Sequence, residues 1–298
     1  MSKPQIGFIG LGLMGGAMAG RLIDCGYGLT VIANRSRETV DALVGRGAVE
    51  VATPRDLAAA SDIVMLCVDT SASVEGRMRG PDGVIAGLRP GAVVIDFGTS
   101  LPESTRALGE EVSAAGGTYL DAPLGRTPAH AKDGLLNIMA AGDKAAFDRV
   151  KPVLDDLGEN VFHLGALGSG HTIKLLNNFF GMTVANAMSE VFGMADRAGI
   201  DRKSVYDVIA AGPLRSGMMD FVSAYALDGD PAQLAFSIRN AGKDVGYYDQ
   251  MVRESGATSL MAQGALTALR EAEAGGMGDL MVSQMVDFHA ARIKGEKG

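Results

Sequence analysis

The chain is poor in the residue types that mark several functional classes. Among its 298 residues there is no tryptophan, and there are only two cysteines and four histidines. Lysine and arginine number 27 against 35 acidic residues, which gives a net charge of −8. A nucleic-acid-binding surface would need a basic stripe, so this charge balance argues against one. The histidines lack metal-ligand spacing, and we expect no metal site.

Long apolar runs are also missing. No run of about 18 or more apolar residues occurs, so we predict no membrane-spanning helix. The apolar start Ile6–Met14 is interrupted by glycines and is not typical of a secretion signal. Cys25 and Cys67 each lie within an apolar pattern, which favours buried free thiols over a disulfide. Together these features favour a cytoplasmic, reducing location.

The length favours two domains, because single cores rarely grow beyond roughly 250–300 residues. Short apolar runs alternate with helical patterns in the first half of the chain, and the runs are apolar on both faces. This pattern predicts an α/β domain with a parallel, doubly wound sheet covered by helices on both sides. The predicted strands are Gln5–Gly10, Leu29–Ala33, Asp62–Val68, Val93–Phe97, Thr118–Asp121, Leu135–Ala141 and Val161–Leu164, and the predicted helices are Met14–Cys25, Arg37–Val44, Leu101–Ala115 and Lys144–Leu157.

The pattern changes at the small-residue stretch Gly165–Gly170, after which no clear strand follows. We therefore predict an α/β domain over residues 1–165 and an all-helical domain over residues 166–298, built on one long helix. The predicted helices of the second domain are His171–Ala198, Arg202–Ala211, Met218–Ala226, Ile238–Ser255, Leu260–Glu273 and Met281–Ile293.

A glycine-rich loop follows the first predicted strand. Gly10-Leu11-Gly12-Leu13-Met14-Gly15 matches G-x-G-x-x-G and opens an apolar helix, which is the context that makes the pattern informative. Gly10 would allow the tight turn, Gly12 would let the backbone approach a pyrophosphate, and Gly15 would let helix and strand pack closely. The helix N-terminus would attract the phosphates. A glycine-rich turn without a ligand is the alternative to this dinucleotide-binding Rossmann unit.

The residues after the second predicted strand indicate which dinucleotide binds. An acidic residue there would accept the ribose 2′-hydroxyl of NAD, but this chain has Asn34-Arg35-Ser36. Arg35 can pair with a 2′-phosphate through two parallel N–H bonds, and Asn34 and Ser36 can add neutral hydrogen bonds. An exposed loop arginine is the alternative. We predict NADP (NADPH) as the cofactor.

Further motifs extend this pattern along nearly the whole chain, which at this point resembles the β-hydroxyacid dehydrogenases. That family includes 3-hydroxyisobutyrate dehydrogenase, tartronate semialdehyde reductase and the cofactor half of 6-phosphogluconate dehydrogenase. Each motif alone is weak, but the five in the family's order are specific. They are Gly7–Gly15, Asp96-Phe97-Gly98-Thr99, Asp121-Ala122-Pro123 with Gly134-Leu135, Lys174-Leu175-Leu176-Asn177-Asn178, and Lys243-Asp244.

The resemblance implies roles for single residues. The family's catalytic lysine falls on Lys174 and its asparagine on Asn178, and positions i and i+4 share one face of a helix. From periodicity alone, Lys174 would be an exposed lysine on an amphipathic helix. The resemblance also implies that Thr99 lies beside the nicotinamide and Lys243 at the cofactor, and we add Val68 to the cofactor-binding set.

The implied reaction is hydride transfer between NADPH and the carbonyl or hydroxyl carbon of a small β-hydroxyacid or semialdehyde. Lys174 would donate a proton to the developing alkoxide in reduction and accept one in oxidation. Two other hypotheses are a non-catalytic NADPH-binding protein and an imine reductase, and Lys174 argues against both. The helical half is too short for 6-phosphogluconate dehydrogenase itself.

The substrate segment departs from the family, which usually has Ser-Gly-Gly after Asp-Ala-Pro. Here the segment is Leu124-Gly125-Arg126-Thr127-Pro128, and its Gly-Arg-Thr is similar to the sulfolactaldehyde reductase branch. We expect Gly125, Arg126 and Thr127 to bind the acid group of the substrate together with Lys174 and Asn178. A carboxylate, sulfonate or phosphonate would suit the planar arginine cation. Alternatively, Arg126 points to solvent or to a cofactor phosphate.

Three other residues are open cases. Gly98 stands where the family usually has serine before Thr99, which either widens the site or removes a hydroxyl. His171 either reaches the substrate or is a helix-start histidine satisfied by backbone. Arg215, followed by Ser216 after a Gly-Pro break, is a candidate to enter the cleft from the helical domain.

The long helix is also a candidate for self-association. Family members pair through this helix, so we expect a homodimer or homotetramer. Packing within one domain is the alternative, since methionines are usually core residues. The residues considered are the small Gly181, Ala185 and Ala187 and the apolar Met182, Met188 and Met194.

Overall fold

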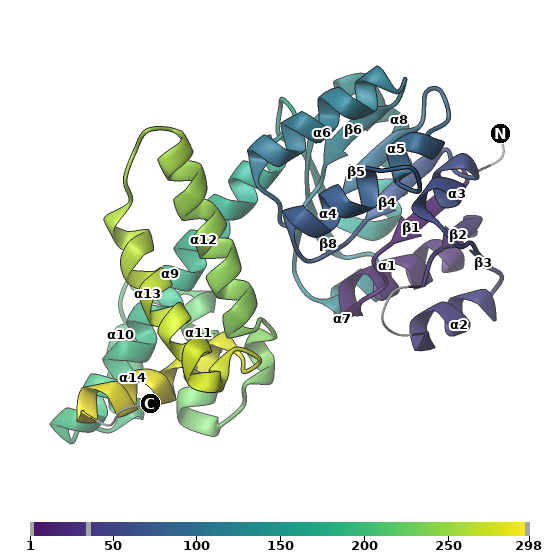
Figure 1. The fold of residues 1–298 in the computed structure, drawn as a ribbon. Helices are drawn as coiled ribbons and strands as arrows, with labels where there is room; N and C mark the ends of the chain where they lie inside the picture. Colours follow the sequence, from purple (N-terminus) through teal and green to yellow (C-terminus); the bar gives the residue numbers. More distant parts are fainter. Residues whose placement is uncertain (1–2, 34–36, 296–298) are drawn as a thin grey trace. The chain divides into compact units, whose positions relative to one another are not determined.

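The computed structural model describes residues 3–33 and 37–295. The chain divides into two compact units, Met1–Lys174 and Leu175–Gly298. The first unit holds a sheet and the second is built from helices (Figure 1). The predicted fold class, a Rossmann-type α/β domain followed by an all-helical one, is confirmed.

The sheet of the first unit has the strand order β3-β2-β1-β4-β5-β6-β8-β7, with β9 paired to β8. Strands β1 to β6 run parallel, as predicted, but β8 is antiparallel to β6 and to β7. The sheet is therefore mixed at one end, because β8 runs opposite to its neighbours β6 and β7. The strands are β1 (Ile6–Ile9), β2 (Leu29–Val31), β3 (Val49–Glu50), β4 (Ile63–Leu66), β5 (Val93–Asp96), β6 (Thr118–Asp121), β7 (Leu124–Gly125), β8 (Leu136–Gly142) and β9 (Gly158–His163).

Helices cover both faces of this sheet (Figure 1). β1, β4 and β5 are buried at every position, which is why their sequences are apolar throughout rather than alternating. Burying a side chain such as Phe8 or Ile95 contributes about 1.5–3 kcal/mol. One face packs on α1 (Leu13–Asp24), α2 (Glu38–Val44), α7 (Pro128–Asp133) and α8 (Lys144–Leu157), and the other on α3 (Pro54–Ala59), α4 (Ser71–Met78), α5 (Val84–Gly87) and α6 (Pro102–Ala114).

The short elements between the predicted ones were not anticipated. β3, α3, α4, α5 and α7 are each too short for a clear periodic pattern. Two of them, α3 and α4, nevertheless begin with a threonine N-cap. Thr53 accepts a hydrogen bond from the Asp56 amide, and Thr70 accepts one from the Ser73 amide. Pro54 also occupies the first turn of its helix, where it needs no hydrogen-bond partner.

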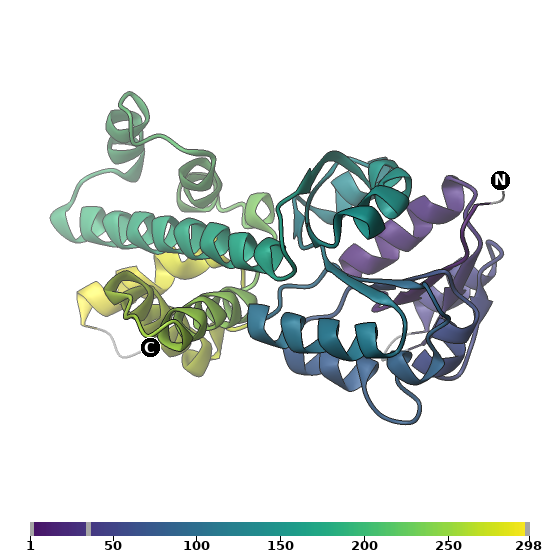
Figure 2. The same ribbon diagram turned by 90° about the horizontal axis from the view of Figure 1, so that it is seen from above.

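The second unit is organised around α9, which begins at the end of the first unit and is one long helix (Figure 2). A core joins α9 to the following helices through residues such as Phe192, Val222 and Leu269. The predicted helix Met281–Ile293 starts one turn later than expected, after the 3-10 segment Val282–Gln284. The helices are α9 (Ser169–Ala198), α10 (Arg202–Ala210), α11 (Gly217–Asp228), α12 (Ile238–Glu254), α13 (Leu260–Ala272) and α14 (Met285–Lys294).

The small and sulfur-bearing residues of α9 divide between core and surface. Met182, Ala185 and Met188 are buried in the core of their own unit, so packing within one domain accounts for them. Phe180 and Met194 remain 70% and 53% exposed. Of the six residues considered from sequence, Met182, Ala185 and Met188 are therefore buried, whereas Gly181, Ala187 and Met194 are at least partly exposed.

Candidate active site

The glycine-rich loop joins β1 to α1, and its glycines serve different purposes. Gly10 has a φ of +92°, and a Cβ there would lie 2.3 Å from the Cys67 carbonyl oxygen. A Cβ on Gly15 would lie 1.9 Å from the Gly10 carbonyl oxygen. The fold itself therefore requires glycine at both positions. Gly12 is exposed, and a Cβ on it would meet nothing within 4 Å, so packing within the protein does not require glycine there.

A hollow of about 530 Å³ opens beside this loop. It lies at the carboxyl ends of β1 and β4, where the strand order reverses direction, which is the usual ligand position in such sheets. Of the predicted cofactor residues, Leu11 and Val68 join Gly10 and Gly12 in its lining, while Leu13 and Met14 begin α1. The residues that sequence reasoning missed are Val40, Cys67, Asp69, Ser73, Gly76 and Arg77.

The predicted 2′-phosphate residues Asn34, Arg35 and Ser36 lie outside the described residues. Their neighbour Arg37 is described, and its guanidinium contacts Asp41 and Glu50, each at 2.9 Å. Arg37 is thus already matched by two carboxylates.

Two alanine substitutions separate the structural glycine from the ligand-facing one. Gly15→Ala is expected to lower the melting temperature strongly, because its Cβ would overlap a backbone oxygen. Gly12→Ala is expected to leave the melting temperature within about 2 °C, since stability changes at unpacked sites stay within about 0.5 kcal/mol. It should nonetheless weaken NADPH binding at least about tenfold, because its methyl group would occupy the phosphate approach. Thermal unfolding and NADPH titration measure both, and unchanged NADPH affinity in Gly12→Ala would remove the loop's assignment.

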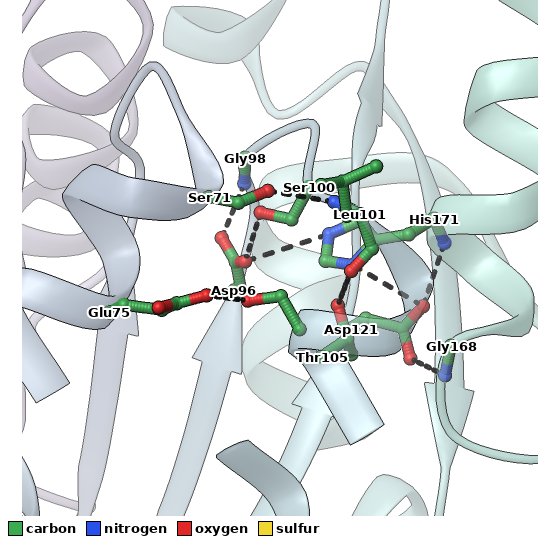
Figure 3. Close-up of polar contacts among 11 residues, drawn as sticks. Ser71, Glu75, Asp96, Gly98, Ser100, Leu101, Thr105, Asp121, Gly168 and His171 are labelled. Atoms are coloured by element: carbon green, nitrogen blue, oxygen red, sulfur yellow. Dashed lines mark hydrogen bonds and ion pairs between the residues drawn. The ribbon is translucent and has the colours of Figure 1, made fainter. Parts of the chain in front are cut away.

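The loop after β5 is held by a buried carboxylate (Figure 3). Asp96 accepts the Gly98 amide on Oδ1 and the Ser100 hydroxyl on Oδ2, both at 2.8 Å. These two bonds flank Thr99 and fix the loop on both sides of it. Gly98 does not widen the site as one interpretation held, because a Cβ there would lie 2.9 Å from Asp96 Oδ1 and from the Val68 carbonyl oxygen.

Lys174 lies in the second turn of α9. Its Nζ donates a hydrogen bond of 2.8 Å to the carbonyl of Leu124, and the side chain is half-buried. Leu124 directly precedes Gly125, so the structure brings the candidate proton donor to the candidate substrate segment. This proximity joins positions 50 residues apart in the sequence.

The side chain of Asn178 is held by a hydrogen bond to an acidic residue. Its Nδ2 donates to Asp244 Oδ2 at 2.6 Å, and its Oδ1 accepts from Asn177 at 3.2 Å. The Nζ of Lys243 lies 3.1 Å from the other oxygen of Asp244 and 5.5 Å from the ring centroid of Tyr247. Two predicted residues, Asn178 and Lys243, thus meet on Asp244. The family motif Lys243-Asp244 contained this residue, but its partner was not evident from sequence.

Arg126 adopts an unusual backbone conformation. It is the one non-glycine residue with positive φ, +78°, in the described ranges. Such a conformation costs of order 1–3 kcal/mol and concentrates at ligand sites. Its Nη1 lies 2.5 Å from Glu159 Oε2 and donates to the Leu135 carbonyl at 2.6 Å. The next residue, Thr127, bonds through its hydroxyl to the ring of His130 at 2.7 Å.

The structure places Arg215 and His171, whose roles the sequence left open, in different surroundings. Arg215 lies 3.5 Å from Asp220 and is exposed in the second unit, and Ser216 caps α11. For His171 two alternatives were open, and the ring is fully buried with its Nδ1 2.7 Å from the Thr105 hydroxyl, so a side chain and not backbone is its hydrogen-bond partner. Only its backbone amide makes the helix-start contact, to Asp121.

Thiols and metal-ligating side chains are the remaining polar features of the chain. Both cysteines are free, as predicted, but both residues are half-buried rather than buried. Burial, and then the charge of Asp96, raises the pKa of Cys67 to about 12, so its thiol stays protonated at neutral pH. Within residues 3–33 and 37–295 no cluster of side chains could hold a metal ion, and no helix is long and apolar enough to cross a membrane.

Known families match both halves of the chain. The model for the NAD-binding domain of 6-phosphogluconate dehydrogenase matches residues 5–165. The model described as the NAD-binding domain of NADP-dependent 3-hydroxyisobutyrate dehydrogenase matches residues 168–289.

Individual relatives agree with these matches. The chain is 35% identical over 216 residues to 2-hydroxy-3-oxopropionate reductase of Escherichia coli K12, covering 72% of this chain and 73% of that protein. It is 32% identical over 253 residues to 2-(hydroxymethyl)glutarate dehydrogenase of Eubacterium barkeri, covering 80% and 83%. The solved structure of Psf3 in complex with NADP+ and 2-OPP has a TM-score of 0.83 at 26% identity and covers 95% of this chain and 99% of Psf3.

Proposed function

Because the chain belongs to the β-hydroxyacid dehydrogenase family, which interconverts CH–OH and carbonyl groups with a pyridine nucleotide, we propose that it uses NADPH to reduce a small anionic aldehyde or ketone. One observation carries the proposal. The Lys174 ammonium reaches the first carbonyl of the segment that contains Gly125, Arg126 and Thr127. This contact supports one local site with Lys174 as proton donor and Arg126 as the anion-binding residue.

The residues present fit a dinucleotide. The space above Gly12 and the positive φ of Gly10 form a cradle that side chains would fill, and the N-terminus of α1 points its free N–H groups there. When bound, the nicotinamide supplies the hydride. Val68 would line the cofactor site, and Thr99 would face the nicotinamide from the loop that Asp96 holds. Lys243 would lie at the cofactor.

Lys174 would hold and transfer the proton. The Leu124 carbonyl accepts an N–H of the ammonium, which holds Lys174 beside the proposed substrate segment, where it would donate to a substrate oxygen. As charge develops on that oxygen during reduction, Lys174 donates a proton to it, and the reverse transfer serves oxidation. Asn178 shares the helix face of Lys174 and is fixed by Asp244, so its amide would orient the same oxygen.

Arg126 would hold the acid group of the substrate. Its planar cation matches the geometry of a carboxylate, sulfonate or phosphonate. Glu159 now neutralises that cation, so a substrate anion would replace the carboxylate of Glu159. The backbone amides near Gly125 and the Thr127 hydroxyl would complete the anion site.

Arg35 would bind the 2′-phosphate of NADPH, and its neighbours Asn34 and Ser36 would add hydrogen bonds. The NADP+ bound by Psf3 supports NADP use in a protein of similar fold. For assembly, we propose a homodimer or homotetramer, and the exposed Phe180, Val191 and Met194 on α9 support an apolar contact there.

One screen of cofactor oxidation tests the function and the cofactor together. Small aldehydes and ketones that bear a carboxylate, sulfonate or phosphonate are offered with NADPH and with NADH, to the natural chain and to Arg35→Ala. We expect turnover with at least one anionic carbonyl compound and a preference for NADPH that Arg35→Ala lowers at least about tenfold, the loss of a charge-assisted bidentate pair. Arg37→Ala is the matched control and should keep the preference, because Arg37 pairs with Asp41 and Glu50. Turnover of imines alone would overturn the reductase assignment, and an unchanged preference in Arg35→Ala would overturn the cofactor assignment.

A further inference from the structure

A buried polar cluster lies beneath the proposed site and is not used by the chemistry above (Figure 3). It consists of Asp96 on β5, Asp121 on β6, Thr105 on α6 and His171 on α9, and each of these residues is at most 2% exposed. Two carboxylates and a histidine are seldom buried together without a role, because burying charge is costly unless it is compensated. All four residues belong to the first unit.

Each carboxylate of the cluster holds a different backbone segment. Asp96 fixes the loop around Thr99 through Gly98 and Ser100. Asp121 accepts the Gly168 amide at 2.8 Å and the His171 amide at 2.7 Å, which satisfies two N–H groups at the start of α9. One carboxylate therefore positions the proposed nicotinamide loop, and the other positions the helix that carries Lys174.

The ring of His171 lies between the two carboxylates. Its Nε2 lies 3.7 Å from Asp96 Oδ2, and its Nδ1 lies 3.9 Å from Asp121 Oδ2. Thr105 donates its hydroxyl to the Leu101 carbonyl at 3.1 Å, so the hydroxyl oxygen is available to accept from Nδ1 at 2.7 Å. That leaves Nε2, which has no hydrogen-bond partner in the described part of the chain, facing Asp96.

The pKa shifts in the cluster show that its ionisable groups interact with one another. Burial raises the pKa of Asp121 above its ordinary value, and His171 is the largest influence that opposes the rise. Tyr119, on β6, is another titratable group here, and burial followed by the charge of Asp96 raises its pKa. The close approach of α9 is also fixed sterically, because a Cβ on Gly170 would lie 2.2 Å from the Met139 carbonyl oxygen.

We propose that His171 is a positioning residue that couples the Thr99 loop to the turn of α9 that carries Lys174. The proposal rests on the function proposed above. Removing the ring would leave two buried carboxylates facing each other and loosen both segments. Hydride transfer and proton transfer must occur at one carbon–oxygen group, and a misplacement of about 1 Å can lower turnover about 100-fold.

The test compares His171→Leu with His171→Gln. Leucine fills the space without a polar atom, whereas the glutamine amide can place an N–H near the position of Nε2. We expect His171→Leu to lower kcat about 30-fold or more, with NADPH affinity within about threefold, and to raise the primary isotope effect with deuterated NADPH. His171→Gln should recover kcat to within about fivefold.

A matched control is His289→Leu, which removes another buried histidine, 3.5 Å from Asn186 Oδ1 in the second unit. Turnover is normalised to bound NADPH, so loss of folded protein alone changes neither kcat nor the isotope effect, and His289→Leu should change neither. If His171→Leu does not fold, Thr105→Val removes the hydroxyl that holds the ring and should lower kcat about fivefold with a raised isotope effect.

The outcomes distinguish this inference from the proposed function. If Lys174→Ala is inactive while His171→Leu, or Thr105→Val in its place, keeps normal kcat and isotope effect, the positioning role is wrong and the function stands. If Lys174→Ala remains active, the proposed function itself fails. Equal losses in His171→Leu and His171→Gln would also overturn the inference, since they would remove any role for the N–H near Asp96.

Discussion

Lys174→Ala is expected to lower kcat for the reduction by about 10²–10⁴-fold, the usual contribution of a positioned general acid. The ammonium donates to the Leu124 carbonyl, and no other lysine comes from this turn of α9. The melting temperature and the NADPH affinity should change little, because the side chain is only half-buried and the glycine-rich loop is intact. Steady-state kinetics with the best compound of the screen measures the loss.

A control and a rescue make this expectation specific. Lys203→Ala removes an exposed lysine that pairs with Asp207 on α10, and it should leave kcat unchanged. Added methylammonium should restore part of the activity of Lys174→Ala but should not stimulate the natural enzyme. Near-normal turnover of folded Lys174→Ala would contradict the catalytic assignment.

Arg126→Ala is expected to raise KM for an anionic substrate about 30- to 100-fold, in line with the roughly 2–3 kcal/mol that charged hydrogen bonds contribute at a binding site. The value of kcat at saturation should fall much less, because Lys174 remains in place. A neutral aldehyde of the same size should show no such difference between the natural chain and the variant. The comparison of KM for the two compounds is the measurement.

Two further variants test the same arginine from opposite directions. Glu159→Gln removes the carboxylate that forms an ion pair with Arg126, so the substrate anion no longer competes with it. KM should therefore fall about two- to fivefold, as expected for releasing a surface ion pair. Arg126→Gly should raise KM as Arg126→Ala does, yet be the more stable of the two, since glycine tolerates the positive φ. An unchanged KM in all three variants would exclude Arg126 from the substrate site.

The sequence predicted the long elements well because their signals are local and strong. The run Asp62–Val68 is apolar on both faces because β4 is buried at every position. The helix Lys144–Leu157 agrees with its predicted bounds, because Asp143 caps it and its apolar residues recur at helical spacing. The short α3 and α5 were missed because six and four residues cannot display a period.

The site was harder to predict, because its contacts join distant segments. The roles of Lys174 and Asn178 could be inferred only from the family's motifs, and those motifs do not reveal that Asp244 holds the amide of Asn178. His171 was ambiguous, since one histidine near a helix start says nothing of Asp96, 75 positions earlier in the chain. The antiparallel direction of β8 relative to β6 and β7 was also missed, because the composition of these strands does not indicate it.

The left-handed backbone at Arg126 has a consequence for how such enzymes can diversify. Because the backbone at this position already has the positive φ that glycine tolerates, substitution of a single codon can add or remove the arginine. The neighbouring main chain then keeps its conformation. Variants with glycine, asparagine or aspartate at this position should therefore be the least disruptive, whereas valine or isoleucine should be poorly tolerated. With Arg126 as the proposed anion-binding residue, selectivity among small acids would change at this single side chain while the proposed catalytic residues stay unchanged.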